Sequence, residues 1–202
     1  MEIVTEVAAL DGRELSVLHP RDPESFLDAE AFEREEYMPY WAEMWPSGIA
    51  LARAVWSRSL GGARVVELGC GLGLPSIAAA LRGARVLATD WSPDALRFAR
   101  VNARRNGARV ETTLCAWSEP DPVVSQAPWD VVLASDVLYE RRNADLLLDL
   151  LPRLVDERGE VLLADPGRTH ARPFLERATE DWTVDERARS RPNVVVYRLR
   201  RR

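Results

Sequence analysis

The stretch that most constrains the fold is VVELGCGLGLP, residues 65–75, in which an apolar run reaches Glu67 and three glycines follow at alternate positions. Gly69, Gly71 and Gly73 allow the backbone to take positive φ angles and to approach a ligand without an intervening Cβ. Loops of this kind join a buried strand to a helix in nucleotide-binding α/β folds. The sequence therefore predicts a strand, a ligand-binding turn and a helix here.

This loop differs from the two common phosphate-binding motifs. Leu74 stands where the third glycine of G-x-G-x-x-G would fall, and no lysine follows as it does in a P-loop. The carboxylate of Glu67 would oppose a pyrophosphate at this place but would favour an ammonium or a sulfonium group. S-adenosylmethionine carries both cations, so we expect it as the cofactor.

A second acid follows at the spacing of a β-α-β unit. Residues 74–81 read as a short helix, and residues 85–89 read as a β-branched strand that ends at Asp90. An acid roughly 20 residues beyond the glycines holds the ribose diol in such folds. We expect Asp90 to bind the ribose and Trp91 to cover the adenine edge. The alternative is an ordinary loop whose acid only caps a helix.

Strands and helices alternate from residue 64 onward, which indicates an α/β protein with a largely parallel sheet. The segments 182–186 and 193–199 are strand-like but are joined too closely for a helical crossover, so they should pair antiparallel at the sheet edge and complete seven strands. The other expected strands cover 64–68, 85–89, 109–114, 130–135 and 158–164, and the expected helices cover 47–59, 74–82, 92–106, 141–155 and 169–180.

The N-terminal part has a different organisation. Residues 3–10 and 14–18 flank Asp11-Gly12, which predicts a β-hairpin outside the main sheet. An acidic stretch, 22–36, leads into an aromatic segment, 37–48. We expect one domain over 1–202, in which 1–45 form the hairpin and a substrate-side cap and 46–202 form the cofactor-binding core.

Bulk properties narrow the function classes. No apolar run has the length of a membrane span and no leader precedes the first strand, so we expect a cytoplasmic protein that does not bind membranes. A net charge of −5 argues against general nucleic-acid binding. Cys70 and Cys115 fit packing better than metal or redox chemistry, and His19 and His170 have no assigned role. No metal is expected.

Further candidate residues lie where the later strands end, because ligands bind outside the carboxyl ends of an open parallel sheet. Adenine can lie against Trp117 beside Ala116, although Trp117 as plain core is the alternative. Asp136 can accept hydrogen bonds from an amine and orient its lone pair toward the sulfonium, unless it only caps the next helix. Asp165 and Arg168 end the fifth strand, and a functional role and a loop role are both open for them.

Three segments together, ELGCGLGLPS, ASDVLYE and YWAEMWPSGIALA, resemble class I S-adenosylmethionine-dependent methyltransferases of the lysine methyltransferase family 16 type, including bacterial relatives labelled nicotinamide N-methylase-like. The resemblance covers residues 37–168 and implies the Rossmann-like methyltransferase fold. It implies that Asp136 and Tyr139, the D-x-x-Y pair, line the acceptor site and that Trp45 lies at the cofactor. Ala116 departs from the family, because many relatives have an aspartate there that contacts the adenine amine.

These observations lead to one main hypothesis and two alternatives. The chain is predicted to transfer a methyl group from S-adenosylmethionine to a protein side-chain amine, that of lysine, by in-line displacement. Asp136 would assist the amine, and Tyr139 and Trp41 would wall the site. In the first alternative the acceptor is a small heteroaromatic or amine, which a closed pocket formed by residues 20–45 would favour. In the second the protein is an inactive cofactor-binding module that binds a partner.

Overall fold

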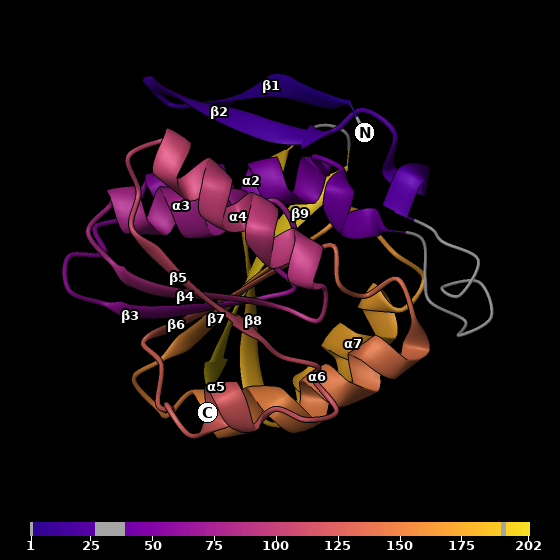
Figure 1. Cartoon of the computed structure of the whole chain (residues 1–202). Helices are drawn as coiled ribbons and strands as arrows, with labels where there is room; N and C mark the ends of the chain where they lie inside the picture. The colour runs from indigo at the N-terminus through magenta and orange to yellow at the C-terminus, as the bar shows by residue number, and fades with distance from the viewer. Residues whose placement is uncertain (1, 27–38, 191–192) are drawn as a thin grey trace.

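The computed structural model describes residues 2–26, 39–190 and 193–202, and its main feature is a sheet with helices on both faces (Figure 1). The order of the seven strands is β5-β4-β3-β6-β7-β9-β8, and β1 and β2 form a separate two-stranded sheet. The strands are β1 (Ile3–Leu10), β2 (Arg13–Pro20), β3 (Arg64–Leu68), β4 (Arg85–Asp90), β5 (Val110–Leu114), β6 (Val131–Ser135), β7 (Glu160–Asp165), β8 (Trp182–Ser190) and β9 (Val194–Arg201). The helices are η1 (Pro23–Phe26), η2 (Tyr40–Ala42), α2 (Pro46–Trp56), α3 (Leu74–Leu81), α4 (Pro93–Arg105), α5 (Asp121–Val124), α6 (Arg141–Leu154) and α7 (Ala171–Ala178).

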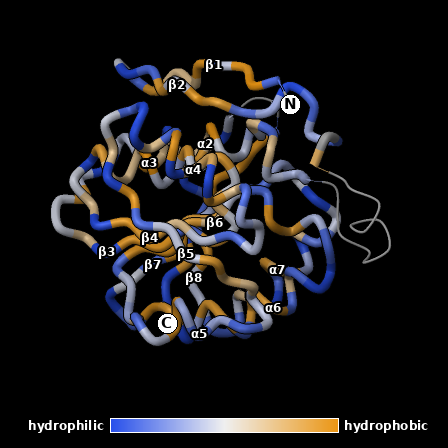
Figure 2. Tube along the Cα trace, viewed as in Figure 1, coloured by the Kyte–Doolittle hydropathy of each residue, from blue (hydrophilic) through white to orange (hydrophobic). Residues whose placement is uncertain are grey.

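The strand pairing confirms the predicted α/β architecture. The five strands from β3 to β7 are parallel to one another, whereas β9 runs antiparallel to both β7 and β8. The apolar inner strands of the sheet appear as orange segments in the middle of the molecule (Figure 2), as is typical of strands covered on both faces. Some details differ from expectation: β8 continues to Ser190, and the sequence did not predict the short helix α5.

Alternate residues of the central strands pack into two apolar cores, one on each face of the sheet. Val65 and Leu133 face the side of α2, α3 and α4, whereas Val66 and Val132 face the side of α6 and α7. This division follows from the two-residue period of a strand. Among the described residues, no helix has the length and apolar character that crossing a bilayer requires.

The end of α2 differs slightly from the prediction. The helix was expected to reach residue 59 but ends at Trp56. Ser57, Ser59 and two glycines follow, and these residue types have low helix propensity.

The predicted hairpin is confirmed, with β1 and β2 paired from Ile3 opposite Pro20 to Leu10 opposite Arg13.

Two asparagines, one in α4 and one at its C-cap, hold the hairpin against the main domain. Asn102 accepts the amide of Leu18 at 2.7 Å and donates to its carbonyl at 3.0 Å. Asn106 does the same with Ser16, at 2.9 and 2.8 Å. Their spacing of four residues places them on one face of the helix. The asparagine side chains therefore pair with β2 much as a neighbouring strand would.

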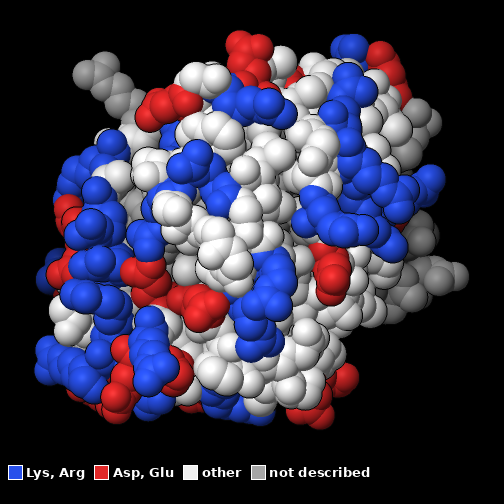
Figure 3. Space-filling view, turned by 90° about the vertical axis from the view of Figure 1, so that its left-hand side faces the viewer, with Lys and Arg blue, Asp and Glu red and all other residues white. Residues whose placement is uncertain are grey.

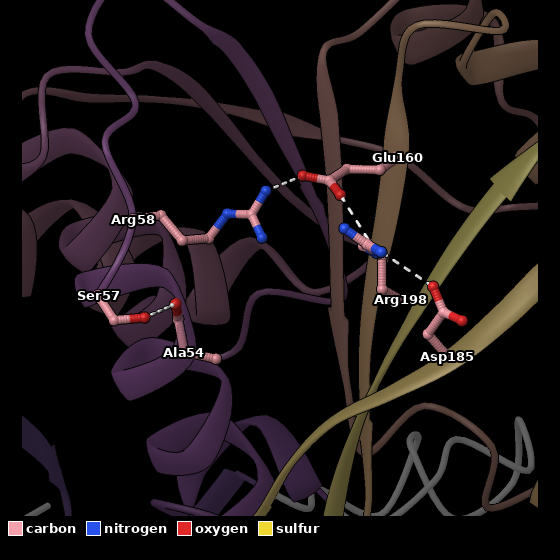
Figure 4. Close-up of polar contacts among 6 residues, drawn as sticks. All are labelled: Ala54, Ser57, Arg58, Glu160, Asp185 and Arg198. Atoms are coloured by element: carbon pink, nitrogen blue, oxygen red, sulfur yellow. Dashed lines mark hydrogen bonds and ion pairs between the residues drawn. The ribbon is translucent and has the colours of Figure 1, made fainter.

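Arginines form ion pairs with acidic side chains at several places. Figure 3, a view of the left-hand side of Figure 1, shows basic groups gathered in clusters with acidic groups beside some of them. Figure 4 shows one network in detail, in which Arg58 pairs with Glu160, and Arg198 lies between Glu160, at 4.0 Å, and Asp185, at 2.9 Å. This network joins the chain just after α2 to β7, β9 and β8.

Candidate active site

A cavity of about 540 Å³ lies at the carboxyl ends of β3, β4, β5 and β6. This is the place where an open parallel sheet binds its ligands. Ten of the residues predicted from the sequence line it: Trp41, Trp45, Gly69, Gly71, Asp90, Trp91, Ala116, Trp117, Asp136 and Tyr139. Four others, Glu67, Gly73, Asp165 and Arg168, are not among the lining residues.

The glycine loop forms one wall and has the predicted backbone conformation. Gly69, Gly71 and Gly73 have φ angles of 67°, 50° and 83°. A Cβ at Gly71 would lie 3.1 Å from the carbonyl oxygen of Trp41, so this position also lacks room for a side chain. Gly73 is the N-cap of α3 and packs against Ala99, behind the wall.

Glu67 lies beneath this loop and is fully buried. Its Oε2 accepts the backbone amide of Ser76 at 2.9 Å and also the Ser76 hydroxyl. Burial raises the pKa of Glu67 to about 8, even though both Ser76 bonds favour the ionised form. The expectation that Glu67 faces the cofactor therefore needs correction, because the side chain organises the loop and is largely uncharged at neutral pH.

Asp90 lies on the wall at the end of β4, as predicted. Its two oxygens accept the amides of Gly71 at 2.9 Å and of Ser92 at 3.0 Å. Burial raises its pKa to about 6, so the carboxylate is ionised at neutral pH. Trp91 follows at the rim with 46% of its surface exposed, which leaves its ring available to a ligand.

The wall beyond β5 contains Ala116 and Trp117. Ala116 is exposed and has no side-chain hydrogen-bonding group, so any polar contact there must come from the backbone. Trp117 lines the cavity and also packs against the core on the α6 side, so both roles considered for it fit. Cys70 and Cys115 lie nearby in the same wall, and burial raises the pKa of both thiols, which keeps them protonated.

Asp136 follows β6 and has an uncommon backbone conformation, with φ of 57°. Such angles in residues other than glycine gather at functional sites. Its Oδ1 accepts Arg168 Nε at 2.7 Å, and its Oδ2 accepts the Ser47 hydroxyl at 3.2 Å. The helix-capping alternative is wrong, because α6 begins only at Arg141, with Glu140 as its N-cap.

Aromatic rings surround the same end of the cavity. The Tyr40 ring lies 5.6 Å from that of Tyr139 and 6.1 Å from that of Trp45, centre to centre. Trp45 Nε1 donates to the Tyr40 carbonyl at 2.6 Å. Trp41 lines the cavity and contacts the ring of Phe98, 5.5 Å away. The aromatic density of residues 37–48 indicated this wall, although Tyr40 itself was not predicted as a site residue.

Asp165 and Arg168 have separate roles. Asp165 is buried, and its Oδ1 accepts the amides of Gly167 and Arg168, both at 2.7 Å. It therefore shapes the loop after β7 and does not form the cavity wall. Burial is the main reason that its pKa is raised. Arg168 reaches Asp136, and its guanidinium carbon lies 5.7 Å from the centre of the Trp45 ring.

Acids outnumber bases along the cavity wall. Glu43, Asp90, Asp136 and Glu140 line it, with Arg142 as the basic residue among the lining residues described. A wall of this charge favours cationic ligands. Within the described ranges, no three His, Cys, Asp or Glu side chains are grouped in a way that could hold a metal ion.

Comparisons with known proteins identify methyltransferases among the relatives of this chain. The electron transfer flavoprotein beta subunit lysine methyltransferase of Xenopus laevis is 35% identical over 73% of this chain and 64% of its own length. The mouse histone-arginine methyltransferase METTL23 is 32% identical over 62% of this chain and 52% of its own length. The chain thus spans about half to two thirds of these relatives.

The fold also matches solved structures. The Thermus thermophilus 16S rRNA N2 G1207 methyltransferase, in complex with AdoMet and guanosine, superposes over 99% of this chain and 51% of its own length, with a TM-score of 0.69 at 16% identity. At this identity the likeness shows a shared fold. The model of the lysine methyltransferase family matches residues 33–181, which is most of the chain. By the match to this family model, the chain belongs to the lysine methyltransferase family.

Proposed function

We propose that this protein is an S-adenosylmethionine-dependent N-methyltransferase whose acceptor is a lysine side chain of another protein. The observation that carries the proposal is the cavity itself. It joins a glycine loop, an ionised carboxylate at the end of β4 and a second carboxylate, Asp136, within one acidic, aromatic-walled space. The lysine and arginine methyltransferases among the relatives support a protein acceptor.

The residues present fit the cofactor. Gly69 and Gly71 expose backbone at the wall, where the amino-acid part would lie. Asp90 would hold the ribose diol, and Trp91 and Trp117 would flank the adenine, with backbone groups at Ala116 in place of an acid. When bound, S-adenosylmethionine supplies a methyl group on a positively charged sulfur.

Asp136 would receive the acceptor. The lysine ammonium would bind the carboxylate as a cation and then give one proton to water, and the remaining N–H bond to Asp136 would turn the freed nitrogen lone pair toward the methyl group. The new N–C bond forms as the S–C bond breaks, the sulfur keeps the electron pair, and the methylated nitrogen is left with the positive charge. Tyr139, Tyr40 and Trp45 would exclude water and place apolar and aromatic surface around the amine.

The test is transfer of labelled methyl groups into proteins of a cell lysate, followed by acid hydrolysis and amino-acid analysis. We expect label in a discrete protein band as methyllysine. Asp136→Asn should reduce transfer at least about 100-fold while cofactor binding persists, whereas Glu111→Gln, a change on the exposed face of β5, should not. Label in methylarginine alone would contradict the lysine assignment.

The same experiment distinguishes a small-molecule acceptor from a protein acceptor. It predicts label only in the small-molecule fraction. The sequence criterion for it, a closed cover formed by residues 20–45, falls partly outside the described residues. An inactive module would bind cofactor and transfer no label into either fraction.

A further inference from the structure

The acceptor end of the cavity is supplied with a cation by the chain itself. Arg168 donates through Nε to Asp136 Oδ1 at 2.7 Å. The hydrogen bond to Asp136 is the main reason that the pKa of Arg168 is raised above its ordinary value, so the guanidinium stays charged. The Asp136 side chain is only 7% exposed, whereas that of Arg168 is 37% exposed. The carboxylate therefore lies inside and the guanidinium on its solvent side.

Backbone structure holds both partners in place. Residues Ser135 and Ala164 are opposite one another in the parallel pair β6 and β7, and the amide of Asp136 donates to the Ala164 carbonyl at 2.9 Å. Asp165 then fixes the turn that places Arg168, through two amide bonds. The pair is thus determined by strand register and loop geometry, not only by the reach of a long side chain.

The contact is nevertheless one that a ligand can displace. A guanidinium can bind a carboxylate through two parallel N–H bonds, but here only Nε donates to Asp136. The other carboxylate oxygen accepts the Ser47 hydroxyl at 3.2 Å, long for an O–H donor. Because Arg168 is more than one third exposed and lies near the Trp45 ring, it can leave Asp136 without being taken out of water.

We propose that Arg168 is the internal counter-ion of Asp136 and occupies the acceptor's place until a cationic acceptor displaces it. This inference rests on the proposed function, because it takes Asp136 as the residue that receives the amine. Arg168 is then a specificity-determining residue. An acceptor cation restores charge balance at Asp136 when it replaces the guanidinium, whereas a neutral acceptor leaves a buried carboxylate unpaired.

The effect of Arg168 on the charge at Asp136 can be tested without knowing the acceptor, by comparing the affinities for two forms of the cofactor. S-adenosylmethionine carries a sulfonium, whereas S-adenosylhomocysteine has a neutral sulfur and otherwise the same groups. Arg168→Met removes the guanidinium charge and keeps an apolar chain beside Trp45. We expect this variant to bind S-adenosylmethionine about 3- to 10-fold more tightly relative to S-adenosylhomocysteine than the wild type does, because the uncompensated carboxylate attracts the sulfonium.

Both affinities are measured by isothermal titration calorimetry. Three further variants show whether a change in their ratio comes from Arg168 and Asp136. Arg168→Lys keeps the positive charge and should keep the wild-type affinity ratio. Asp136→Asn combined with Arg168→Met should also keep the wild-type affinity ratio, because this variant has no carboxylate at position 136 to attract the sulfonium. Arg172→Met removes an arginine that is paired with Glu176 on the surface of α7 and should leave the ratio unchanged. Circular dichroism verifies that each variant is folded.

The outcomes separate the two proposals. If the wild type fails to bind S-adenosylmethionine, the proposed function is wrong. If the wild type binds it but the affinity ratio is the same in Arg168→Met, or the rise persists in the double variant, only the counter-ion proposal is overturned. Displacement is tested in a crystal with S-adenosylhomocysteine and n-butylammonium, which carries the cation of a lysine side chain. We expect the ammonium at Asp136 in place of Arg168, and a retained contact between Arg168 and Asp136 beside the bound ammonium would refute the exchange.

Discussion

The carboxylate of Asp90 accepts the backbone amide of Gly71 at 2.9 Å, so the acid at the end of β4 and the glycine loop after β3 form one unit. Because burial raises the pKa of Asp90 to about 6, the ionised form predominates at neutral pH and is lost in mildly acidic solution. We expect the affinity for S-adenosylmethionine to fall as the pH drops below about 6, by up to about tenfold per pH unit.

Calorimetric titrations between pH 5 and pH 8 measure this dependence. Asp90→Asn should bind more weakly at pH 8 and should lack the Asp90-dependent decrease between pH 6 and pH 5. An unchanged pH profile in this variant would show that another group causes the decrease.

Gly71 is predicted to be the loop position least tolerant of a side chain. Gly71→Ala places a Cβ 3.1 Å from the Trp41 carbonyl oxygen at a φ of +50°. The backbone conformation alone costs about 1–2 kcal/mol. We expect a lower melting temperature and loss of measurable cofactor binding. Gly61→Ala is the matched control, because nothing lies within 4 Å of its Cβ and its φ is not positive.

Glu67 should make the stability of the protein depend on pH. Its pKa is about 8 in the folded protein and about 4.3 in an unfolded chain. Between these values the folded state binds the proton and the unfolded state does not, so stability falls as the pH rises through this range. Glu67→Gln removes this contribution.

The melting temperatures of wild type and Glu67→Gln should therefore be similar near pH 5. The variant should become progressively more stable than the wild type as the pH rises toward 8, and the difference should then level off. A constant difference across this range would mean that Glu67 is ionised in the folded protein throughout.

Asn102 connects the hairpin to the glycine loop. Besides its two bonds to Leu18, its Nδ2 donates to the Leu72 carbonyl at 3.2 Å, and the side chain is fully buried. Asn102→Ala leaves these backbone groups without their partner and should lower the free energy of unfolding by about 2–4 kcal/mol. Val101→Ala, at an exposed position of α4, is the control in urea denaturation. Equal effects would contradict the role of Asn102.

The sequence predicted the parts of the molecule that local pattern encodes. The alternation of apolar strands and amphipathic helices gave the sheet, and the glycines with Asp90 marked its ligand-binding edge. Glu67 was expected to face the cofactor but is buried beneath the loop, because a position near the end of a strand does not show whether its side chain is buried. Whether its carboxylate faces a ligand or turns inward depends on Ser76, nine residues later, which supplies its hydrogen bonds.

The pairing of Asp136 with Arg168 required knowledge of strand order. The two residues are 32 positions apart and meet only because β6 and β7 are adjacent and in register. Ser47 reaches Asp136 from α2, 89 positions away, for the same kind of reason. Site residues at strand ends were therefore predictable one by one, but their contacts with each other were not.

The most direct test of the central claim, that an acidic cavity at the carboxyl edge of the sheet holds a cationic methyl donor, is a crystal structure with S-adenosylmethionine. We predict its ribose at Asp90 and its sulfonium directed toward Asp136. An empty cavity in crystals saturated with the donor, or NADH bound there in its place, would contradict the account.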